Sequence, residues 1–392
     1  MISSPPDIGS QCIILGNKSD PRVQGFLQAL QQRGVNDASV IDYTADWSQL
    51  LPSLVKPDTL LRIESPGFDL AAVRQLMQRG NSQLEAEGLT PMSSQEMTGL
   101  PAENGAFIPP HAVYFGLRQR LLELQDLLAD TSHISCMNHV PDILTFYDKQ
   151  ACHQQLAQHD IPQARPLYNI QSYDALRDAM QQQGLANVFI KTRYGSGASG
   201  IIALKTAGSK LHAYTTLEQA DGSLHKARLY NRRKLITLTD ESRLKQLVNQ
   251  LCQWGVHCEA WIPKASLDGQ SCDCRLVVVN GEPEFAVLRK SHTPMTNLHL
   301  LNDRADIATL RDIMDQQDWE SLLNTARKLA AIFPKSFHFS PDIAVHQNKQ
   351  RHSVLEVNAF GDYIRHCQVN GMNSYEWELE QWSKRNGTGG HS

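Results

Sequence analysis

The sequence predicts an α/β chain in which an open sheet comes first and hairpin-rich α+β lobes follow. Three observations support this prediction. In the first third of the chain, short apolar runs alternate with segments of helical spacing, as in an open α/β sheet. After Ile161 and Pro162 the pattern changes to pairs of strands joined by short turns. One turn contains Asn280-Gly281, a dipeptide typical of tight hairpins.

The predicted elements follow one another in a regular order. Apolar runs bounded by turn residues predict strands, and apolar residues three and four positions apart predict helices. The segment 80–110 is rich in glycine and proline, and we expect it to be irregular. The expected strands are 12–15, 40–43, 59–63, 188–191, 201–204, 274–279, 284–288, 343–346 and 353–357, and the expected helices are 23–32, 70–77, 117–128, 146–159 and 319–333.

The composition excludes several classes of protein. The chain has 392 residues, enough for two to three domains of about 150 residues each. Its 37 basic and 41 acidic residues give a net charge of −4, so no strong positive field exists to bind nucleic acid. No stretch of about 18 apolar residues could cross a membrane, and residues 1–10 lack the pattern of a secretory signal. We expect a cytoplasmic protein that binds neither nucleic acid nor a membrane.

The eight cysteines indicate buried thiols in a reducing compartment. A chain of this length does not need disulfides for its stability. Cys272 and Cys274 lie one residue apart in a predicted strand, so both face one side of the sheet and Asp273 faces the other. Their spacing differs from that of a zinc knuckle, and we interpret them as core residues rather than metal ligands.

A glycine-rich loop follows a lysine at the end of a predicted strand. Gly195, Gly197 and Gly200 match the GxGxxG pattern of dinucleotide-binding loops, but that pattern requires a helix to begin within the loop. The apolar run 201–204 predicts a strand instead. This arrangement suits a flap whose backbone amides, with Lys191, contact phosphate groups. The alternative is a mobile surface hairpin with an incidental lysine.

Two acidic residues lie in apolar strand sequence near the end of the chain. A buried carboxylate is costly unless a cation compensates for it. The alternation of side chains along a strand places Glu356 and Asn358 on one face, and the hairpin places Asp342 beside them. Three oxygen ligands of this kind suit the Mg²⁺ that accompanies ATP. The alternative is that Asp342 and Glu356 face solvent on an edge hairpin.

Taken in order, these residues resemble the ATP-grasp superfamily over roughly residues 146–361. Asp148 and Lys149, which open a predicted helix, resemble the family's first nucleotide-contacting lysine, and Lys191 resembles the second. The loop 195–200 then resembles the family's phosphate-covering loop. Residues 259–262 resemble its hinge segment, whose backbone and apolar side chains hold adenine.

The resemblance also covers the far end of the chain. Arg275 and Arg289 resemble the strand pair that brings an arginine to the transferred phosphate. Asp342 resembles a metal ligand, and Glu356 with Asn358 resembles the family's ExN signature. The resemblance therefore implies ATP and Mg²⁺, or Mn²⁺, as cofactors. The residues that it assigns to ATP are Lys149, Lys191, Gly195, Ser196, Gly197, Ala198, Ser199, Gly200, Glu259, Ala260, Trp261 and Ile262.

The ATP-grasp architecture implies three lobes with ATP between the last two. The expected boundaries are an N-terminal α/β domain at 1–136, a central lobe with the flap at 137–258, a lobe with the metal site at 259–382 and a disordered tail at 383–392. Residues 296–299 also resemble the glutathione-synthetase and ribosomal-protein glutamate-ligase branch. There a glycine pair follows, where this chain has Leu301 and Asn302. A segment like 61–67 recurs in a bacterial ATP-grasp group whose substrates are unassigned.

The resemblance implies a carboxylate-amine ligase that works through an acyl phosphate. Lys191, Arg275 and Arg289 are then expected to neutralise the charge that develops on the phosphate groups. The expected partners are small-molecule or peptide carboxylates and amines, and a homodimer is a further expectation, since many relatives are dimers. Two alternatives stay open: a small-molecule kinase on the same scaffold, and an ATP-binding regulator without catalysis.

Two arginines are candidates for holding the substrate. Arg62 and Glu64 lie at the predicted carboxyl end of a strand of the open sheet, where such sheets bind ligands. Arg365 follows the strand with the proposed metal ligands, and its guanidinium could hold a carboxylate. The alternative for Arg365 is the start of a surface helix.

Overall fold

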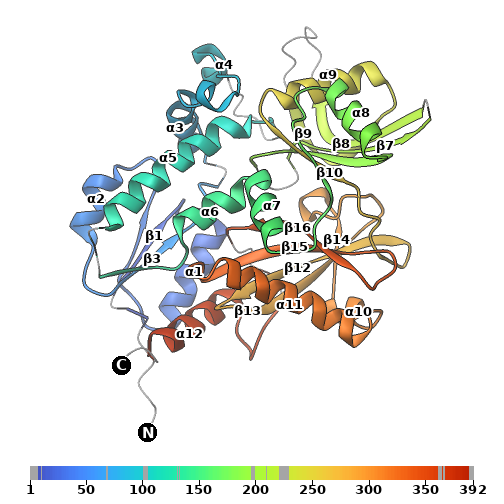
Figure 1. Cartoon of the computed structure of the whole chain (residues 1–392). Helices are drawn as coiled ribbons and strands as arrows, with labels where there is room; N and C mark the ends of the chain where they lie inside the picture. Colours follow the sequence, from blue (N-terminus) through green and yellow to red (C-terminus); the bar gives the residue numbers. More distant parts are fainter. Residues whose placement is uncertain are drawn as a thin grey trace.

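The computed structural model describes residues 8–9, 11–67, 69–99, 105–129, 131, 133–195, 199–208, 210–219, 229–360, 364 and 367–387. Their strands form three sheets, which Figure 1 shows mainly in blue, in green to yellow and in orange. An open sheet followed by two sheets built from hairpins is the α/β arrangement that the sequence predicts. No helix in these residues is long and apolar enough to cross a membrane.

The first sheet is parallel and has the strand order β2-β1-β3-β4. Strands β1 and β3 are buried along their whole length, because helices cover both faces of the sheet. One face packs against α2, α3 and α5, and the other packs against α1 and α12. The elements are β1 (Gln11–Leu15), α1 (Pro21–Gln32), β2 (Ala38–Ile41), α2 (Trp47–Leu54), β3 (Thr59–Ile63), α3 (Leu70–Asn81), α5 (Pro110–Ala129) and β4 (Ile134–Cys136).

The segment that we expected to be irregular is partly helical. Helix α3 continues through Gly80, and η1 (Glu85–Glu87) and α4 (Ser94–Thr98) precede α5. A Cβ on Gly80 would lie 2.0 Å from the Ala112 carbonyl oxygen, and one on Gly116 would lie 1.8 Å from the Leu76 carbonyl oxygen. These glycines therefore allow α3 and α5 to pack closely. The sequence alone cannot distinguish such a contact from a helix end.

The second sheet has the strand order β5-β10-β6-β7-β8-β9, and its neighbouring strands are antiparallel. Helices α8 and α9 cover one face with a continuous apolar core (Figure 1). The expected strand pair around the glycine loop is present, with Lys191 opposite Ile201. The elements are β5 (Pro166–Leu167), α8 (Tyr173–Gln182), β6 (Asn187–Thr192), β7 (Ile201–Ala207), β8 (Lys210–Gln219), β9 (Leu229–Leu238), α9 (Glu241–Cys252) and β10 (Val256–Ala260).

The third sheet has the order β14-β13-β12-β15-β16, with β11 paired to β12. The expected hairpin turn is confirmed, since Asn280 and Gly281 have φ values of 50° and 91°. Cys272 and Cys274 lie in the core with α11, as predicted, and all eight cysteines are free. The elements are β11 (Ser266–Leu267), β12 (Gln270–Val279), β13 (Glu282–Ser291), η2 (Leu298–Leu300), β14 (Asp303–Ala305), α10 (Ile307–Arg311), α11 (Gln316–Ile332), β15 (His338–Val345) and β16 (His352–Asn358).

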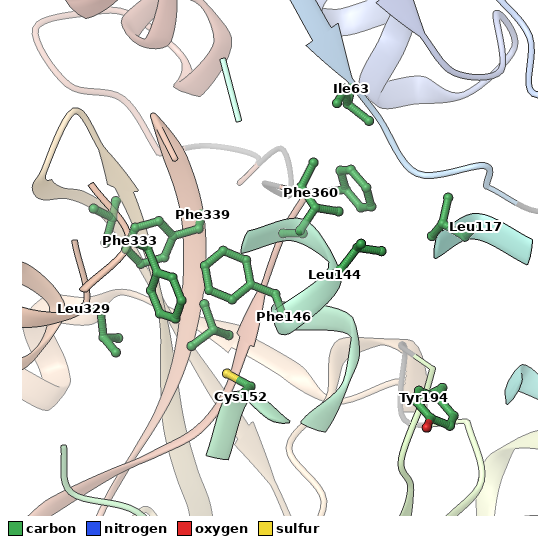
Figure 2. Close-up of a cluster of buried hydrophobic side chains, with 14 of the residues drawn as sticks. Ile63, Leu117, Leu144, Phe146, Cys152, Tyr194, Leu329, Phe333, Phe339 and Phe360 are labelled. Carbon is green, nitrogen blue, oxygen red and sulfur yellow. The ribbon is translucent and has the colours of Figure 1, made fainter. Parts of the chain in front are cut away.

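The single helix expected at 146–159 is two helices, α6 (Val140–Tyr147) and α7 (Lys149–Gln158). Asp148 separates them and caps α7, because its carboxylate accepts hydrogen bonds from the backbone amides of the next turn. Figure 2 shows Phe146 of α6 beside two aromatic rings of the third sheet's core. Its ring centroid lies 4.6 Å from that of Phe333 and 5.6 Å from that of Phe339. The core thus continues from the first sheet into the third.

We expected a disordered tail at residues 383–392. This expectation is wrong for residues 383–387, which are helical. Helix α12 (Ser374–Gly387) continues past that point and lies beside α1 (Figure 1). Ser383 is fully buried, and the ring of Trp382 packs edge-on against Phe337 at 4.9 Å. Tyr375, Leu379 and Trp382 share the spacing of one buried helix face. The polar, glycine-rich composition of the last residues concealed that apolar pattern.

We expected Arg62 to contact the substrate. The structure instead places it in a buried ion network. Its Nε donates to Glu64 at 2.7 Å, its Nη1 donates to Glu378 of α12 at 2.5 Å, and its guanidinium lies 4.0 Å from the ring centre of Phe26. None of the Arg62 side chain is exposed, because α12 covers this end of β3. The network ties the end of the chain to the first sheet.

Replacing Arg62 with methionine should destabilise the fold strongly. The change leaves two buried carboxylates without their cation, which costs about 3 to 5 kcal/mol in free energy of unfolding. Urea denaturation measures this loss. Arg33→Met is the matched control, because Arg33 pairs with Glu380 of the same helix at partly exposed positions and should cost about 1 kcal/mol or less. Equal losses in the two variants would contradict the role given to Arg62.

Candidate functional site

A cavity lies between the second and third sheets. Its walls come from β6, β7 and β10 on one side and from β12, β13, β15 and β16 on the other, and the first residue of α7 also lines it. The structure brings together in this lining most of the residues that the sequence singled out. These are Lys149, Lys191, Gly195, Ser199, Glu259, Ala260, Ile262, Arg289, Asp342 and Glu356.

Four other predicted residues stand behind or beside this lining. The carbonyl of Gly200 accepts a hydrogen bond from the backbone of Thr192, and the ring of Trp261 packs against Phe189 at 5.2 Å. Arg275 contacts the lining residue Asp342, and Asn358 contacts Ser340 on the neighbouring strand, as described below. Ser196, Gly197, Ala198 and Arg365 lie outside the described residues.

Two lysines enter the cavity from different elements. Lys149 is the first residue of α7, and its Nζ donates to the carbonyl oxygen of Gly195 at 2.5 Å. Lys191 lies on β6, and its Nζ is 2.6 Å from Glu259 Oε1 on the neighbouring strand β10. His257 Nε2 is 3.2 Å from the other oxygen of Glu259. One buried carboxylate therefore holds Lys191 at the cavity wall.

The lysines differ in how firmly they keep their charge. Burial disfavours the charged form of Lys191, but the Glu259 and Glu356 carboxylates outweigh burial, and the pKa of Lys191 is raised. For Glu259, burial is outweighed by the charges of Lys191 and His257, which lower its pKa to about 2. Burial lowers the pKa of Lys149, since Glu356 compensates for it only in part. An anionic ligand would stabilise the charged form of both lysines.

The predicted oxygen ligands lie side by side on the hairpin β15–β16. Asp342 stands directly opposite Glu356, and Ser340 stands opposite Asn358. The Nδ2 of Asn358 donates to the Ser340 carbonyl oxygen at 3.1 Å, which leaves its Oδ1 as the atom that could act as a ligand. Two carboxylates and one amide oxygen are hard donors of the kind that hold Mg²⁺ together with substrate phosphates. Among the described residues, no cluster of three or more His, Cys, Asp or Glu forms a self-contained metal site.

Two arginines neutralise Asp342. Arg275 of β12 donates through Nε and Nη2 at 2.6 and 2.9 Å, and Arg289 of β13 donates through Nη1 at 3.0 Å. Burial would raise the pKa of Asp342, but the two guanidinium groups outweigh it and hold that pKa well below its usual range. Arg289 lines the cavity and Arg275 does not. Of the two arginines expected at the transferred phosphate, Arg289 is therefore the one that faces the cavity.

Lys264 is a cavity residue that the sequence analysis missed. Its Nζ donates to Asp273 Oδ2 and to Thr296 Oγ1, each at 2.8 Å. Asp273 also accepts a hydrogen bond from Arg289 Nε at 2.7 Å. The only signal in the sequence was a lysine two residues after Ile262, in an otherwise apolar linker. Lys264 connects the segment between the sheets to the loop that carries Thr296.

An apolar wall completes the cavity. Phe189 and Met295 line it and belong to one apolar cluster that also contains the half-buried Trp261. Leu355 adds an apolar surface from β16. A planar, apolar ligand group has a suitable environment here, close to the backbone of residues 259–262. The sequence analysis assigned that backbone segment but did not identify Phe189, Met295 or Leu355.

Comparisons with known proteins support the fold. No family model matches the sequence, and no curated protein matches it. Among solved structures, the macrocyclase MdnC bound with precursor peptide MdnA from Microcystis aeruginosa MRC has a TM-score of 0.52 and 12% identity, covering 96% of this chain and 100% of that one. The D-cycloserine synthetase DcsG has a TM-score of 0.52 and 13% identity, covering 95% and 99%.

A third similar structure is the ATP-grasp ligase PsnB complexed with precursor peptide PsnA2 and AMPPNP. It has a TM-score of 0.50 and 14% identity, and covers 97% of this chain and 100% of that one. The shared fold extends over nearly the whole chain, so the ATP-grasp architecture that the sequence predicts is confirmed. Residues 8–136, which precede the segment that carries the resemblance, are part of that architecture.

The Lys191–Glu259 pair should make stability depend on pH in the acid range. Glu259 has a pKa of about 2 in the folded chain and its usual value of 4.5 in the unfolded chain, so its contribution is complete at neutral pH and is lost as the pH falls from about 5 toward 2. Between pH 7 and pH 3.5 the loss should be about 1 kcal/mol. Urea denaturation of the wild type and Glu259→Gln at both pH values measures it.

The Glu259→Gln variant should be less stable than the wild type at pH 7 and should lack this acid-dependent loss. Glu320→Gln, at an exposed position of α11, is the control that should keep it. If the wild type and Glu259→Gln lose equal stability on acidification, Glu259 does not carry a depressed pKa.

Proposed function

We propose that this chain is an ATP-dependent carboxylate-amine ligase. The observation that carries the proposal is the composition of one cavity. Lys149 and Lys191 on one side oppose Arg289, Asp342 and Glu356 on the other, and an apolar wall lies beside them. A nucleoside triphosphate with its divalent cation needs these three kinds of surface together. That ligases such as PsnB and MdnC share the fold makes ligation the chemistry to test first.

In this proposal each part of ATP has its own residues. The backbone of residues 259–262, with Phe189 and Met295, holds adenine. Lys149, Lys191 and the amides of the glycine loop neutralise the α- and β-phosphates. Mg²⁺ or Mn²⁺, when bound by Asp342, Glu356 and Asn358, supplies positive charge to the phosphate oxygens. The Lys191–Glu259 pair keeps the lysine pointing into the cavity before ATP binds.

Two steps follow in the proposed reaction. An oxygen of the substrate carboxylate attacks the γ-phosphorus, and the bond from that phosphorus to the β,γ-bridging oxygen breaks, which gives an acyl phosphate and ADP. The nitrogen of an amine then attacks the acyl carbon, and the bond to the phosphate oxygen breaks, which leaves an amide, phosphate and a proton. Arg289 lies where it can neutralise the transferred phosphate and then the tetrahedral oxyanion. No side-chain nucleophile is required.

Glu356→Gln and Lys191→Ala should each abolish ATP turnover, with a fall of at least about a hundredfold in kcat. The first removes one of two carboxylates that face the metal, and the second removes the buried cation beside the phosphates. ADP release measured with a coupled assay checks both. Glu320→Gln and Lys328→Ala, at exposed positions of α11, are the matched controls and should keep full activity. Full activity in either cavity variant would overturn the assignment.

Arg289→Met should lower kcat more than Arg275→Met does. Arg289 lines the cavity and reaches both Asp273 and Asp342, whereas Arg275 contacts Asp342 from outside the lining. We expect Arg275→Met to raise the Mg²⁺ concentration needed for half-maximal rate, because Asp342 loses one of the groups that orient it. Steady-state rates at varied Mg²⁺ separate the two effects. Equal losses in kcat would show that the two arginines act as a unit.

The reaction class is tested with pools of carboxylates and amines in the presence of ATP and Mg²⁺. A ligase forms ADP only when both substrates are present. Mass spectrometry then shows a product whose mass equals the masses of the two substrates together minus that of one water. Glu356→Gln serves as the blank. A phosphorylated product without an amine requirement would identify a kinase instead.

A further inference from the structure

Exposed basic residues lie on three neighbouring strands of the second sheet. Arg232, Arg233 and Lys234 are consecutive and exposed on β9. Lys205 of β7 and Lys210 of β8 are exposed as well. We call these five residues the basic face. In a chain with a net charge of −4, such a local excess of positive charge marks a surface that meets an anionic partner.

A bulge in β9 produces the exposure of the three consecutive residues. The pairing of β8 with β9 passes from Thr215 opposite Ile236 to Leu217 opposite Asn231, so residues 232–235 stand opposite Thr216 alone. Regular pairing is interrupted at these extra residues, so their side chains need not alternate between the two faces of the sheet. Glu218 neutralises Arg232, and the other four residues of the basic face still give a local excess of positive charge.

The basic face adjoins the cavity. Leu235, the residue after Lys234, packs in the apolar cluster that contains Met295, and Met295 lines the cavity. On β7, Ile201 lines the cavity, Ala203 belongs to the same cluster and Lys205 follows on the same side of the strand. An anion bound on the basic face would therefore lie beside the mouth of the proposed ATP site.

We propose that the basic face binds an acidic segment of a peptide or protein substrate, whose carboxylate enters the cavity. This inference rests on the proposed ligase function and adds the class of substrate. A run of Asp or Glu side chains supplies both the charge that the basic face complements and the carboxylate that the reaction consumes.

A nucleic acid is the competing polyanion, and the observations favour the peptide. A nucleic-acid surface usually has an extended positive field, whereas this chain is acidic overall, with a sequence pI of about 6.4. The basic face is also confined to three neighbouring strands. A peptide brings the reacting group to the cavity, which a nucleic acid does not.

Fluorescein-labelled hexaglutamate is the probe, and fluorescence anisotropy measures its binding to the full chain at low salt. We expect binding that weakens as salt is added and that falls at least about tenfold in the charge-reversed variant R233E/K234E. The matched control is K328E/K335E, which reverses two exposed charges on α11 and the loop after it and changes the net charge equally. It should bind as the wild type does.

Other results would overturn the inference. The first is that hexaglutamate does not bind, and the second is that both variants lose binding equally. The third is that single-stranded RNA competes more strongly than unlabelled hexaglutamate. Binding of a fluorescent ATP analogue is measured in the same samples and should not differ between R233E/K234E and the wild type. If that analogue does not bind the wild type, the proposed function fails. If it binds and hexaglutamate does not, only the inference on the substrate fails.

Discussion

The buried charge of Asp342 is the constraint on which the site depends. A carboxylate this far from solvent costs several kcal/mol unless cations with good geometry surround it. Arg275 and Arg289 meet that requirement from two strands, and Asp273 in turn holds Arg289. Arg275, Arg289 and Asp342 lie on three different strands of the third sheet. A shift of register between β12, β13 and β15 would therefore leave some of these charges unpaired. The ion network therefore fixes the alignment of these three strands.

The same rule governs the facing wall of the cavity. Glu259 on β10 neutralises Lys191 on β6, and the two strands are neighbours in the second sheet. The ion pair of Lys191 thus lies within its own sheet, while the Glu356 carboxylate of the third sheet also favours the charge of Lys191 across the cavity. Lys264 joins the loop of Thr296 to β12 from the segment between the sheets. In the proposed function, ATP binds between these two walls.

Local patterns were sufficient to predict much of this arrangement. The alternation of side chains along β15 and β16 determines which residues of that hairpin face the same side, so the positions of Asp342 and Glu356 followed from neighbouring sequence. Arg62 could not be placed in this way, because its partner Glu378 is 316 residues away in sequence. Lys264 likewise depends on a loop 32 residues later. Long-range pairing of buried charges is the information that a single sequence lacks.

Binding of a charged ligand in such a cavity is an exchange of partners. The described cations of the lining already contact carboxylates or a carbonyl group: Lys191 contacts Glu259, Lys264 contacts Asp273, Arg289 contacts both acidic residues of its network and Lys149 contacts the Gly195 carbonyl. In the proposed function, a phosphate group would take over these hydrogen bonds, and a divalent cation would take over the oxygens of Asp342. The described cations of the lining are therefore paired within the protein, which offsets part of the cost of their burial.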